Sequence, residues 1–295
     1  MVGWLIYSVL EVEKNKRYIQ FYLDEGKRLN LDIQLILVED LMFGVKDNMW
    51  FMTYKKEVIK YPEFVICRTI YPLLTKQFEF LGIPVFNNSQ IAEICNDKAK
   101  TYQYVAQLGI QMVDSAFCKY PMIEGSLEHI AVPTVIKAVA GHGGSQVFLL
   151  DPGESTHVEC FNADIGRELD GSDVVMQPLI GSRHQDLRVY IIGNEIIGSI
   201  LRTAKEGFKS NFSLGGEVTR YDLSSGEIQL VKRIMTLFDI GMVGIDFIIG
   251  DEGQLVFNEI EDVAGARMLY QCMDINLAAL YLNYIRARLL NEKNW

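Results

Sequence analysis

The sequence has few cysteines, and they follow no pattern that would give them a shared role. Its five cysteines stand singly among 295 residues, without a Cys-x-x-Cys pair or a matching histidine spacing. This arrangement argues against a disulfide framework and against a zinc site. An isolated cysteine among apolar residues usually packs as a small hydrophobic side chain. We therefore expect a reduced, cytoplasmic setting.

The sequence also lacks an excess of basic residues and an apolar run long enough for a membrane helix. Its formal net charge is −10, whereas binding to nucleic acid rests on clustered lysines and arginines. Apolar runs such as 240–249 are broken by Gly or Asp and fall short of the ~20 residues a membrane helix needs. The first residues, 1–7, predict a strand and not a signal peptide. We therefore expect neither a nucleic-acid nor a membrane partner.

Motifs for a catalytic nucleophile are missing as well. No serine lies in a Gly-x-Ser-x-Gly setting, and no glycine-rich loop ends in Lys-Ser or Lys-Thr as a P-loop does. The four histidines show no metal-ligand spacing. The remaining composition, 49% apolar and 22% charged, is that of an ordinary globular protein. A chain of this length forms one large domain, or two to three subdomains around a cleft.

The first third of the sequence predicts a parallel sheet. Short apolar runs alternate there with amphipathic stretches such as 14–29, which is typical of βαβ units. Ser89 and Asp97 follow this region and are predicted N-caps of two helices. The predicted strands are 4–9, 33–38, 64–67 and 83–86.

The second half predicts antiparallel pairing. The runs 188–192 and 195–202 are β-rich and are separated by Gly193-Asn194, which is a strong hairpin signal. Two further apolar runs, 243–249 and 255–261, flank a turn with glycine at both ends. We therefore expect a second, antiparallel sheet.

Three carboxylates in the last two predicted strands carry the most informative spacing. If the turn makes a hairpin, Asp246 lies on one strand, while Glu259 and Glu261, two residues apart, point to the same face of its neighbour. Oxygen ligands of this kind suit Mg²⁺, which typically takes one or two carboxylates together with water and phosphate. The alternative is a set of acids that face solvent on an exposed edge.

Two groups of basic and glycine-rich residues point to bound anions. The apolar run 133–137 delivers Lys137 to a glycine-rich loop, 141–145, whose backbone amides can approach a phosphate closely. Arg188, Arg202 and Lys205 cluster around the first hairpin and predict a pocket for anionic groups. A flexible hairpin tip and a solvated, salt-bridged hairpin are the respective alternatives.

Taken in order, these segments resemble the ATP-grasp superfamily, most closely its RimK-like amino-acid ligases. The resemblance spans about 64–261 and is strongest in 186–216, where an Asp-x-Arg strand, a hairpin, Arg-x-x-Lys-x-Gly and a Ser-Asn segment ending in Gly-Gly follow one another. It implies an α/β (α+β) chain with the ATP-grasp fold. The implied parts are a parallel-sheet pre-ATP-grasp domain (1–96), a small central lid subdomain (97–181) and an antiparallel-sheet domain with the metal and substrate site (182–295).

The resemblance also implies roles for individual residues. ATP would be held by two lysines, the glycine-rich loop, a hinge at 177–180 and a later Lys-Ser-Asn segment. The implied nucleotide-binding residues are Lys98, Lys137, Gly143, Gly144, Ser145, Gln177, Pro178, Leu179, Ile180, Asp186, Lys209, Ser210 and Asn211. The implied metal ligands are Asp246, Glu259 and Glu261, the catalytic cations are Arg188, Arg202 and Lys205, and the substrate-binding residues are Arg68, Arg202 and Arg267.

Three segments depart from the family pattern. Pro178-Leu179 stand where relatives usually have an acidic and then an aromatic residue, so adenine recognition would rest more on the backbone. Glu261 stands where Asn is usual, which adds negative charge at the metal site. The run 262–267 replaces the common Ser-Pro-Gly and ends in Arg267, either a substrate contact or a surface arginine at a helix end.

The activity implied is an ATP-dependent carboxylate–amine ligase. The γ-phosphoryl group passes to a substrate carboxylate, and an amine then attacks the acyl phosphate, with two Mg²⁺ ions (or Mn²⁺) and Lys or Arg neutralising charge. The partners implied are a small-molecule or peptide carboxylate and an amine, with a homo-oligomer as the commonest assembly. The alternatives are a nucleotide-binding protein without turnover and a small-molecule kinase on the same fold.

Overall fold

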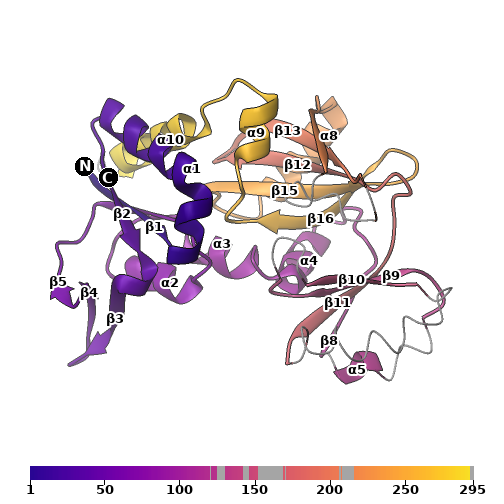
Figure 1. Cartoon of the computed structure of the whole chain (residues 1–295), viewed down its shortest axis with the longest axis horizontal. Helices are drawn as coiled ribbons and strands as arrows, with labels where there is room; N and C mark the ends of the chain where they lie inside the picture. Colours follow the sequence, from indigo (N-terminus) through magenta and orange to yellow (C-terminus); the bar gives the residue numbers. More distant parts are fainter. Residues whose placement is uncertain are drawn as a thin grey trace.

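The computed structural model describes residues 1–119, 121–124, 130–141, 146–151, 169, 171–205, 207 and 216–292. Within these ranges it contains a parallel sheet near the N-terminus, two antiparallel sheets further along the chain, and a small three-stranded antiparallel sheet (Figure 1). The mixed fold class expected from the sequence is confirmed. In the described part, no helix is both long and apolar enough to span a membrane.

The N-terminal unit is built on a parallel sheet, as predicted. Its strands are β1 (Val2–Tyr7), β2 (Asp32–Leu37), β6 (Phe64–Cys67) and β7 (Val85–Phe86), in the order β2-β1-β6-β7. Helix α1 (Val9–Arg28) connects the first two strands, and α2 (Pro72–Phe80) begins with proline, whose missing N–H costs nothing in a first helical turn. Strand β1 is buried on both sides, so its residues form a continuous apolar run.

The residues of the small antiparallel sheet come between β2 and β6 in the sequence, and this sheet was not predicted. A short 3₁₀ turn (Val38–Asp40) leads into β3 (Leu41–Lys46), β4 (Met49–Tyr54) and β5 (Glu57–Val58). Asp47 and Asn48 connect β3 to β4 and both have positive φ, of 50° and 60°. Asp and Asn tolerate the left-handed region better than other residues with a side chain, which suits them to a two-residue hairpin turn.

Two helices follow the parallel sheet, α3 (Ser89–Ile94) and α4 (Lys98–Ala106). Asp97 caps α4 as predicted, because its side chain accepts a hydrogen bond from the Lys100 N–H. The prediction that Ser89 caps α3 was wrong, because Asn88 accepts from the Ile91 N–H. The Ser89 hydroxyl donates to Glu79 on α2 instead, at 2.7 Å.

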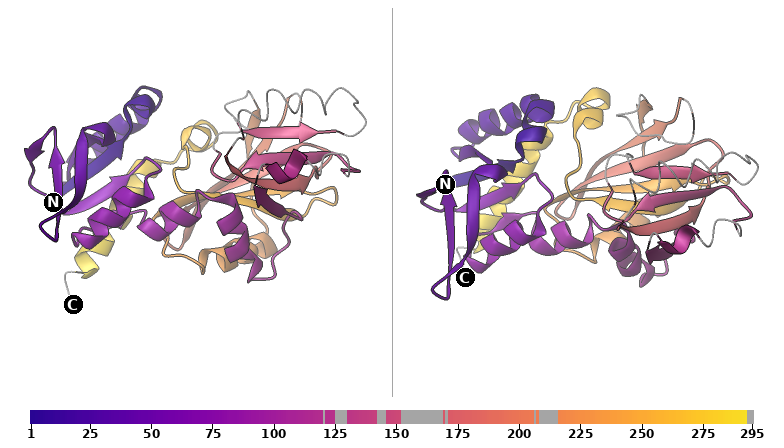
Figure 2. Two further views of the ribbon diagram at one scale, coloured as in Figure 1. Left: turned by 90° about the horizontal axis from the view of Figure 1, so that it is seen from below. Right: turned by 60° about the horizontal axis from the view of Figure 1, so that its bottom comes forward.

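The central sheet has the order β10-β9-β11-β8 and is antiparallel throughout. Its strands are β8 (Ala116–Lys119), β9 (Thr134–Ala138), β10 (Val147–Leu150) and β11 (Asp173–Pro178), and α5 (Pro121–Glu124) follows β8. A small core that includes Ile136 and Val174 stabilises this sheet. In Figure 1 the sheet lies beside the C-terminal sheet, and the other views show the same arrangement (Figure 2).

The C-terminal sheet has the order β14-β13-β12-β15-β16. Its strands are β12 (Gln185–Ile192), β13 (Glu195–Thr203), β14 (Glu217–Arg220), β15 (Met242–Ile249) and β16 (Leu255–Glu261). One face carries residues such as Leu187, Ile245 and Phe257, which form a core with α3, α4 and α8 (Ser225–Met235). Because side chains alternate along a strand, the charged residues between them lie on the opposite face.

The end of the chain returns to the N-terminal unit. After β16 come α9 (Arg267–Cys272) and α10 (Leu277–Glu292), and α10 packs against α1. Tyr18 and Tyr22 of α1 share a core with Tyr281 and Leu282 of α10. In both views of Figure 2, α10 lies among the N-terminal elements, away from the strands that precede it in sequence. This return fixes α1 next to the charged face of the C-terminal sheet.

Candidate active site

The charged face of the C-terminal sheet results from strand register. Antiparallel pairing places Arg188 of β12 opposite Asp246 of β15, and Asp246 opposite Glu259 of β16. On the other side of β12, Asp186 lies opposite Arg202 of β13. Gly244 precedes this row, and a Cβ atom there would lie 3.2 Å from the Arg188 side chain. The sheet therefore brings acids and arginines from four strands onto one face.

Asp246 is the centre of a buried ion network. Arg188 donates to both of its carboxylate oxygens, from Nε at 2.7 Å and from Nη2 at 2.6 Å, and Arg202 Nη2 donates at 2.7 Å. The Asp246 side chain is completely buried. Burial opposes its ionisation, but the charges of Arg188 and Arg202 outweigh burial and lower the pKa of Asp246 to about 2. Asp246 is therefore an anion with both oxygens already hydrogen-bonded.

The two arginines each bind a second acid. Arg188 Nη1 lies 2.5 Å from Glu261 Oε2, and Arg202 forms a two-bond pair with Asp186 at 2.5 and 2.6 Å. Burial raises the pKa of Glu261, although Arg188 acts in the opposite direction. Paired guanidinium groups of this kind are held in a fixed plane, which suits them to orient carboxylate or phosphate oxygens.

Two lysines approach the same face from the central elements. Lys98, the first residue of α4, lies 3.4 Å from Glu259 Oε2 and donates to the Gly141 carbonyl. Lys137 of β9 donates to Asn258 Oδ1 at 3.1 Å, so it bridges the central and C-terminal sheets. Burial, together with the charge of Lys98, lowers the pKa of Lys137 to about 8 despite the opposing effect of Glu259.

Several groups of the predicted hinge already form hydrogen bonds within the protein. The Gln177 side chain is buried and donates to Tyr102 Oη at 2.7 Å and to Ser115 Oγ at 2.8 Å. The Leu179 N–H donates to the Pro133 carbonyl at 2.8 Å. Pro178 has no N–H, so of its backbone groups only the carbonyl can contact a ligand.

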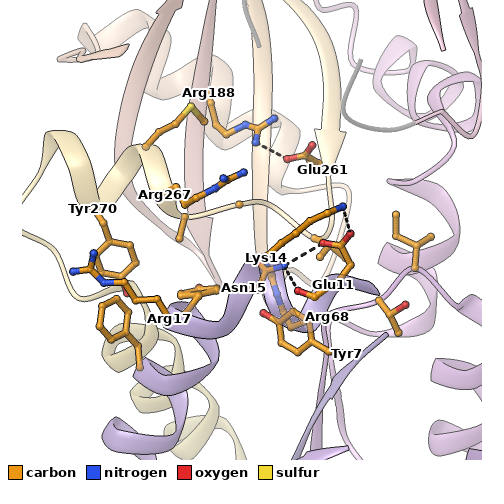
Figure 3. Close-up of a pocket in the computed structure, with 18 of the residues that line it drawn as sticks. Tyr7, Glu11, Lys14, Asn15, Arg17, Arg68, Arg188, Glu261, Arg267 and Tyr270 are labelled. Atoms are coloured by element: carbon orange, nitrogen blue, oxygen red, sulfur yellow. Dashed lines mark hydrogen bonds and ion pairs between the residues drawn. The ribbon is translucent and has the colours of Figure 1, made fainter. Parts of the chain in front are cut away.

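A cavity of about 1170 Å³ opens between the charged sheet face and the N-terminal unit. It is lined by α1 residues and the loop after β6, by Arg188, Arg202 and Glu261, and by the segment 263–271, whose Tyr270 lies beside Arg17 of α1 (Figure 3). Six cationic and two acidic side chains line it, a balance of +4 in a chain whose net charge is −10. The cations are Lys14, Arg17, Arg68, Arg188, Arg202 and Arg267, and the acids are Glu11 and Glu261.

The three predicted metal ligands share one sheet face but do not form a complete metal cage. Among the residues that the structure describes, no group of three or more His, Cys, Asp or Glu side chains is placed to hold an ion by itself. Glu259 and Glu261 are each 26% exposed, whereas Asp246 is enclosed by arginines. This donor set fits Mg²⁺, which needs only one or two protein carboxylates when nucleotide phosphates and water complete its shell.

Several predicted residues lie elsewhere or outside the described part. Lys205 is exposed, lies 3.9 Å from Glu217 and does not line the cavity. Gly143, Gly144, Ser145, Lys209, Ser210 and Asn211 lie outside the described residues.

The contribution of α1 to the cavity was not predicted from the sequence. Lys14, Arg17 and Tyr18 line it, and no motif singles them out in the sequence. The amphipathic pattern of the helix showed that one face is buried, but it did not show which part of the chain would pack there. The return of α10 to α1 is a long-range feature, and it decides where the helix lies.

Comparison with known proteins agrees with this geometry. A model of the RimK-like ATP-grasp domain matches residues 95–285. The chain is 27% identical over 278 residues to the uncharacterized protein MG011 homolog of Mycoplasma pneumoniae (92% of this chain, 88% of the relative), and 29% identical over 216 residues to a probable alpha-L-glutamate ligase of Legionella pneumophila (72% and 70%). The ATP-grasp ligase PsnB, solved with a precursor variant, Mg and ADP, superimposes with a TM-score of 0.68 at 17% identity, covering 96% of this chain and 97% of that one.

The chain therefore belongs to the RimK-like ATP-grasp family, because the family model covers well over half of it. It is an ATP-dependent ligase that forms amide bonds. ATP and Mg²⁺ are the cofactors of this family.

Proposed function

We propose that the protein joins an acidic amino acid, or a peptide bearing one, to an amine through an acyl phosphate. The observation that carries this proposal is the cavity, because it connects Glu261, Arg188 and Arg202 with a basic wall from the N-terminal unit. A space of this size accommodates two substrates side by side, and its positive balance favours carboxylates. Similarity to a probable alpha-L-glutamate ligase supports the same substrate class.

In this proposal the nucleotide lies between the central and C-terminal sheets. Lys98 and Lys137 would neutralise phosphate charge. Both lie at the proposed metal site, because Lys98 contacts Glu259 and Lys137 donates to Asn258, the residue before it. The residues Gln177 to Ile180 would receive the adenine through backbone groups, and Asp186 would contact the ribose. Gly143, Gly144, Ser145, Lys209, Ser210 and Asn211 complete the proposed phosphate site. The division at about 97 and 182 into N-terminal, lid and C-terminal parts belongs to the same proposal.

Glu259 and Glu261 are the proposed principal Mg²⁺ ligands, with Asp246 as the third. Bound Mg²⁺ would offset the negative charge of the phosphates; we propose two ions, and Mn²⁺ as a substitute. Asp246 Oδ2 accepts from both arginines and Oδ1 accepts from Arg188 alone, so Oδ1 would keep a lone pair for an ion. Its present bonds also let it hold Arg188 and Arg202 in place.

The arginines would bind and orient the reacting groups. Arg188 and Arg202 are fixed by acids on three strands, and preorganised donors of this kind stabilise charge as it develops in a transition state. Arg267 and Arg68 would hold substrate carboxylates, and Lys205 would assist at the phosphates. No protein nucleophile is needed, because the acyl phosphate forms directly on the substrate.

The test is ADP release by the purified protein with Mg·ATP and a panel of acidic amino acids, short peptides and amines, given singly and in pairs. We expect turnover that requires both an acid and an amine and that is lost in Glu259→Gln/Glu261→Gln. ADP release with a single hydroxyl compound would instead indicate a kinase. ATP binding without turnover on the whole panel would indicate a binding protein.

A further inference from the structure

Two residues at the ends of neighbouring parallel strands form what we name the floor pair, Tyr7 and Arg68. Tyr7 is the last residue of β1, and Arg68 directly follows β6, which pairs with β1. Both line the cavity, and Figure 3 shows them close together beside Glu11 and Lys14. Ligands of open α/β sheets bind outside the carboxyl ends of the strands, which is where this pair lies.

Arg68 is a buried cation without an acid partner. Its side chain is 5% exposed, and among the described residues no carboxylate lies within ion-pair distance of it. Nη2 donates to the Ala264 carbonyl at 2.7 Å, while Nε has no hydrogen-bond partner in the described part of the chain. Arg188 and Arg202, by contrast, are each matched by two acids. Because an unpaired buried charge is costly, this difference points to an anionic ligand at Arg68.

The Tyr7 hydroxyl is the second unsatisfied group. It is 1% exposed and lies close enough to the Arg68 guanidinium to interact with it, but it has no hydrogen-bond partner of normal geometry among the described residues. Burial raises the pKa of this hydroxyl, against the effect of the neighbouring Arg68 charge, so the group keeps its proton and remains a donor. A buried polar group without a partner destabilises the fold, and a ligand that accepts its hydrogen bond would remove that cost.

We propose that the floor pair binds a substrate carboxylate that is not the one phosphorylated. Tyr7 would donate a hydrogen bond to it, and Arg68 would supply the opposite charge. This inference rests on the proposed ligase function and deepens it, because it identifies the residues that bind the second carboxylate of the acidic substrate. It also makes Tyr7, which has no motif in the sequence, a specificity residue.

The position of the floor pair separates it from the reacting end of the cavity. In Figure 3, Arg188 and Glu261 lie at one end, with Tyr7 and Arg68 at the other. The predicted metal ligands belong to the first end, so the acid to be phosphorylated would bind there. A dicarboxylate that spans the cavity would be held at both ends, which fixes its direction.

The experiment compares Tyr7→Phe with Tyr281→Phe. Tyr281 is a matched control, because its hydroxyl is also buried without a hydrogen-bond partner in the described part, yet Tyr281 does not line the cavity. Binding of L-aspartate, L-glutamate and N-acetyl-L-aspartate is measured by calorimetry in the presence of Mg²⁺ and AMP-PNP, with L-glutamine as the monocarboxylate probe. Thermal unfolding of each protein is recorded alongside.

We expect Tyr7→Phe to weaken the best dicarboxylate about 10- to 100-fold, as for loss of a hydrogen bond to a charged group. Its thermal stability should be unchanged or higher, and its affinity for AMP-PNP unchanged. Tyr281→Phe should alter neither the affinity for the dicarboxylate nor the affinity for AMP-PNP. L-glutamine should bind more weakly than L-glutamate to the parent protein, because it has only one carboxylate to place at the two ends of the cavity.

Three results would overturn the inference while leaving the ligase proposal intact. The first is a Tyr7→Phe variant that is less stable but binds dicarboxylates normally, and the second is an equal loss of dicarboxylate affinity in Tyr281→Phe. The third is a parent protein that binds AMP-PNP but none of the dicarboxylates. Failure of the parent protein to bind AMP-PNP would overturn both proposals, and the nucleotide titration identifies that case separately.

Discussion

Asp246 shows how single residues determine this site. Its carboxylate accepts three hydrogen bonds from Arg188 and Arg202 at 2.6–2.7 Å, with no exposure to solvent. The sequence predicted Asp246 as an acid that shares a face with Glu259 and Glu261, and register confirms that placement. It could not predict the arginine partners, because they come from strands 44 and 58 residues away in sequence.

Replacing Asp246 should therefore affect stability as well as activity. Asp246→Asn leaves two buried arginines with less opposite charge, and we expect the free energy of unfolding to fall by about 3–5 kcal/mol. Glu261→Gln is the control, because Glu261 is partly exposed and contacts Arg188 through one bond, so we expect a loss of about 1 kcal/mol or less. Urea unfolding measures both, and equal losses would contradict this account.

Lys137 gives the nucleotide site a dependence on pH. Its pKa is about 8 without ligand, and the charged groups around it are Lys98, Glu259 and Asp186. Below pH 8 the Lys137 amine is already protonated before the nucleotide binds. Above pH 8 it is mostly neutral, so binding of the phosphate is accompanied by uptake of a proton by this amine. We expect nucleotide affinity measured without Mg²⁺ to fall as the pH rises from 8 to 9, with net proton uptake.

Calorimetry in two buffers of different ionisation enthalpy measures that proton uptake. Lys137→Arg retains its charge throughout this range, so its binding should show no uptake linked to this position. A parent protein whose proton uptake near pH 8.5 equals that of Lys137→Arg would contradict the prediction.

At the scale of secondary-structure elements, Asn87 joins the N-terminal unit to the C-terminal sheet. It exchanges hydrogen bonds with both backbone groups of Met242, at the start of β15, and donates to Asp262 Oδ1 at 2.6 Å. Asn96 binds the other Asp262 oxygen at 3.1 Å. Asp262 directly follows Glu261, so these bonds fix the end of the strand that carries two predicted metal ligands.

Removing this connection should destabilise the protein more than removing a helix cap beside it. Asn87→Ala leaves several buried groups unpaired, and we expect a loss of about 2–4 kcal/mol in the free energy of unfolding. Asn88→Ala removes only the cap of α3 and a surface contact to Asp239, for about 1 kcal/mol. Chemical denaturation compares the two, and a larger loss in Asn88→Ala would show that Asn87 does not join the units.

Elements with clear apolar runs or glycine turns were predicted well, and a hairpin with exposed strands and the exact position of one helix cap were not. The β12–β13 hairpin followed from Gly193-Asn194, and the parallel sheet from alternating apolar runs. The β3–β4 hairpin was not predicted although Asp47-Asn48 is a turn signal, because apolar residues of β3 such as Met42 and Val45 are exposed and so do not mark a buried face. Asn88, not Ser89, caps α3, an error of one residue that only the side-chain bonds resolve.

At the scale of the whole molecule, the contrast in charge between the cavity and the protein should govern substrate capture. Fields from charges in a concave site raise the local concentration of opposite charge, and salt screens them over about 10 Å at 0.1 M. We expect KM for an anionic acid substrate to rise several-fold between about 0.05 and 0.5 M salt, with kcat little changed. Steady-state kinetics with a neutral amine partner at saturation measures this, and a KM independent of salt would contradict it.

The wall that α1 forms separates two tasks that many enzymes place on the same element. In the proposed mechanism phosphoryl chemistry belongs to the strands β12, β13, β15 and β16, whereas Lys14, Asn15 and Arg17 contact the cavity from a helix outside that sheet. Exposed helix positions tolerate substitution at small cost in stability. Substrate preference can therefore drift, in evolution or in a directed library confined to one turn of α1, while the machinery for activating carboxylates is inherited unchanged.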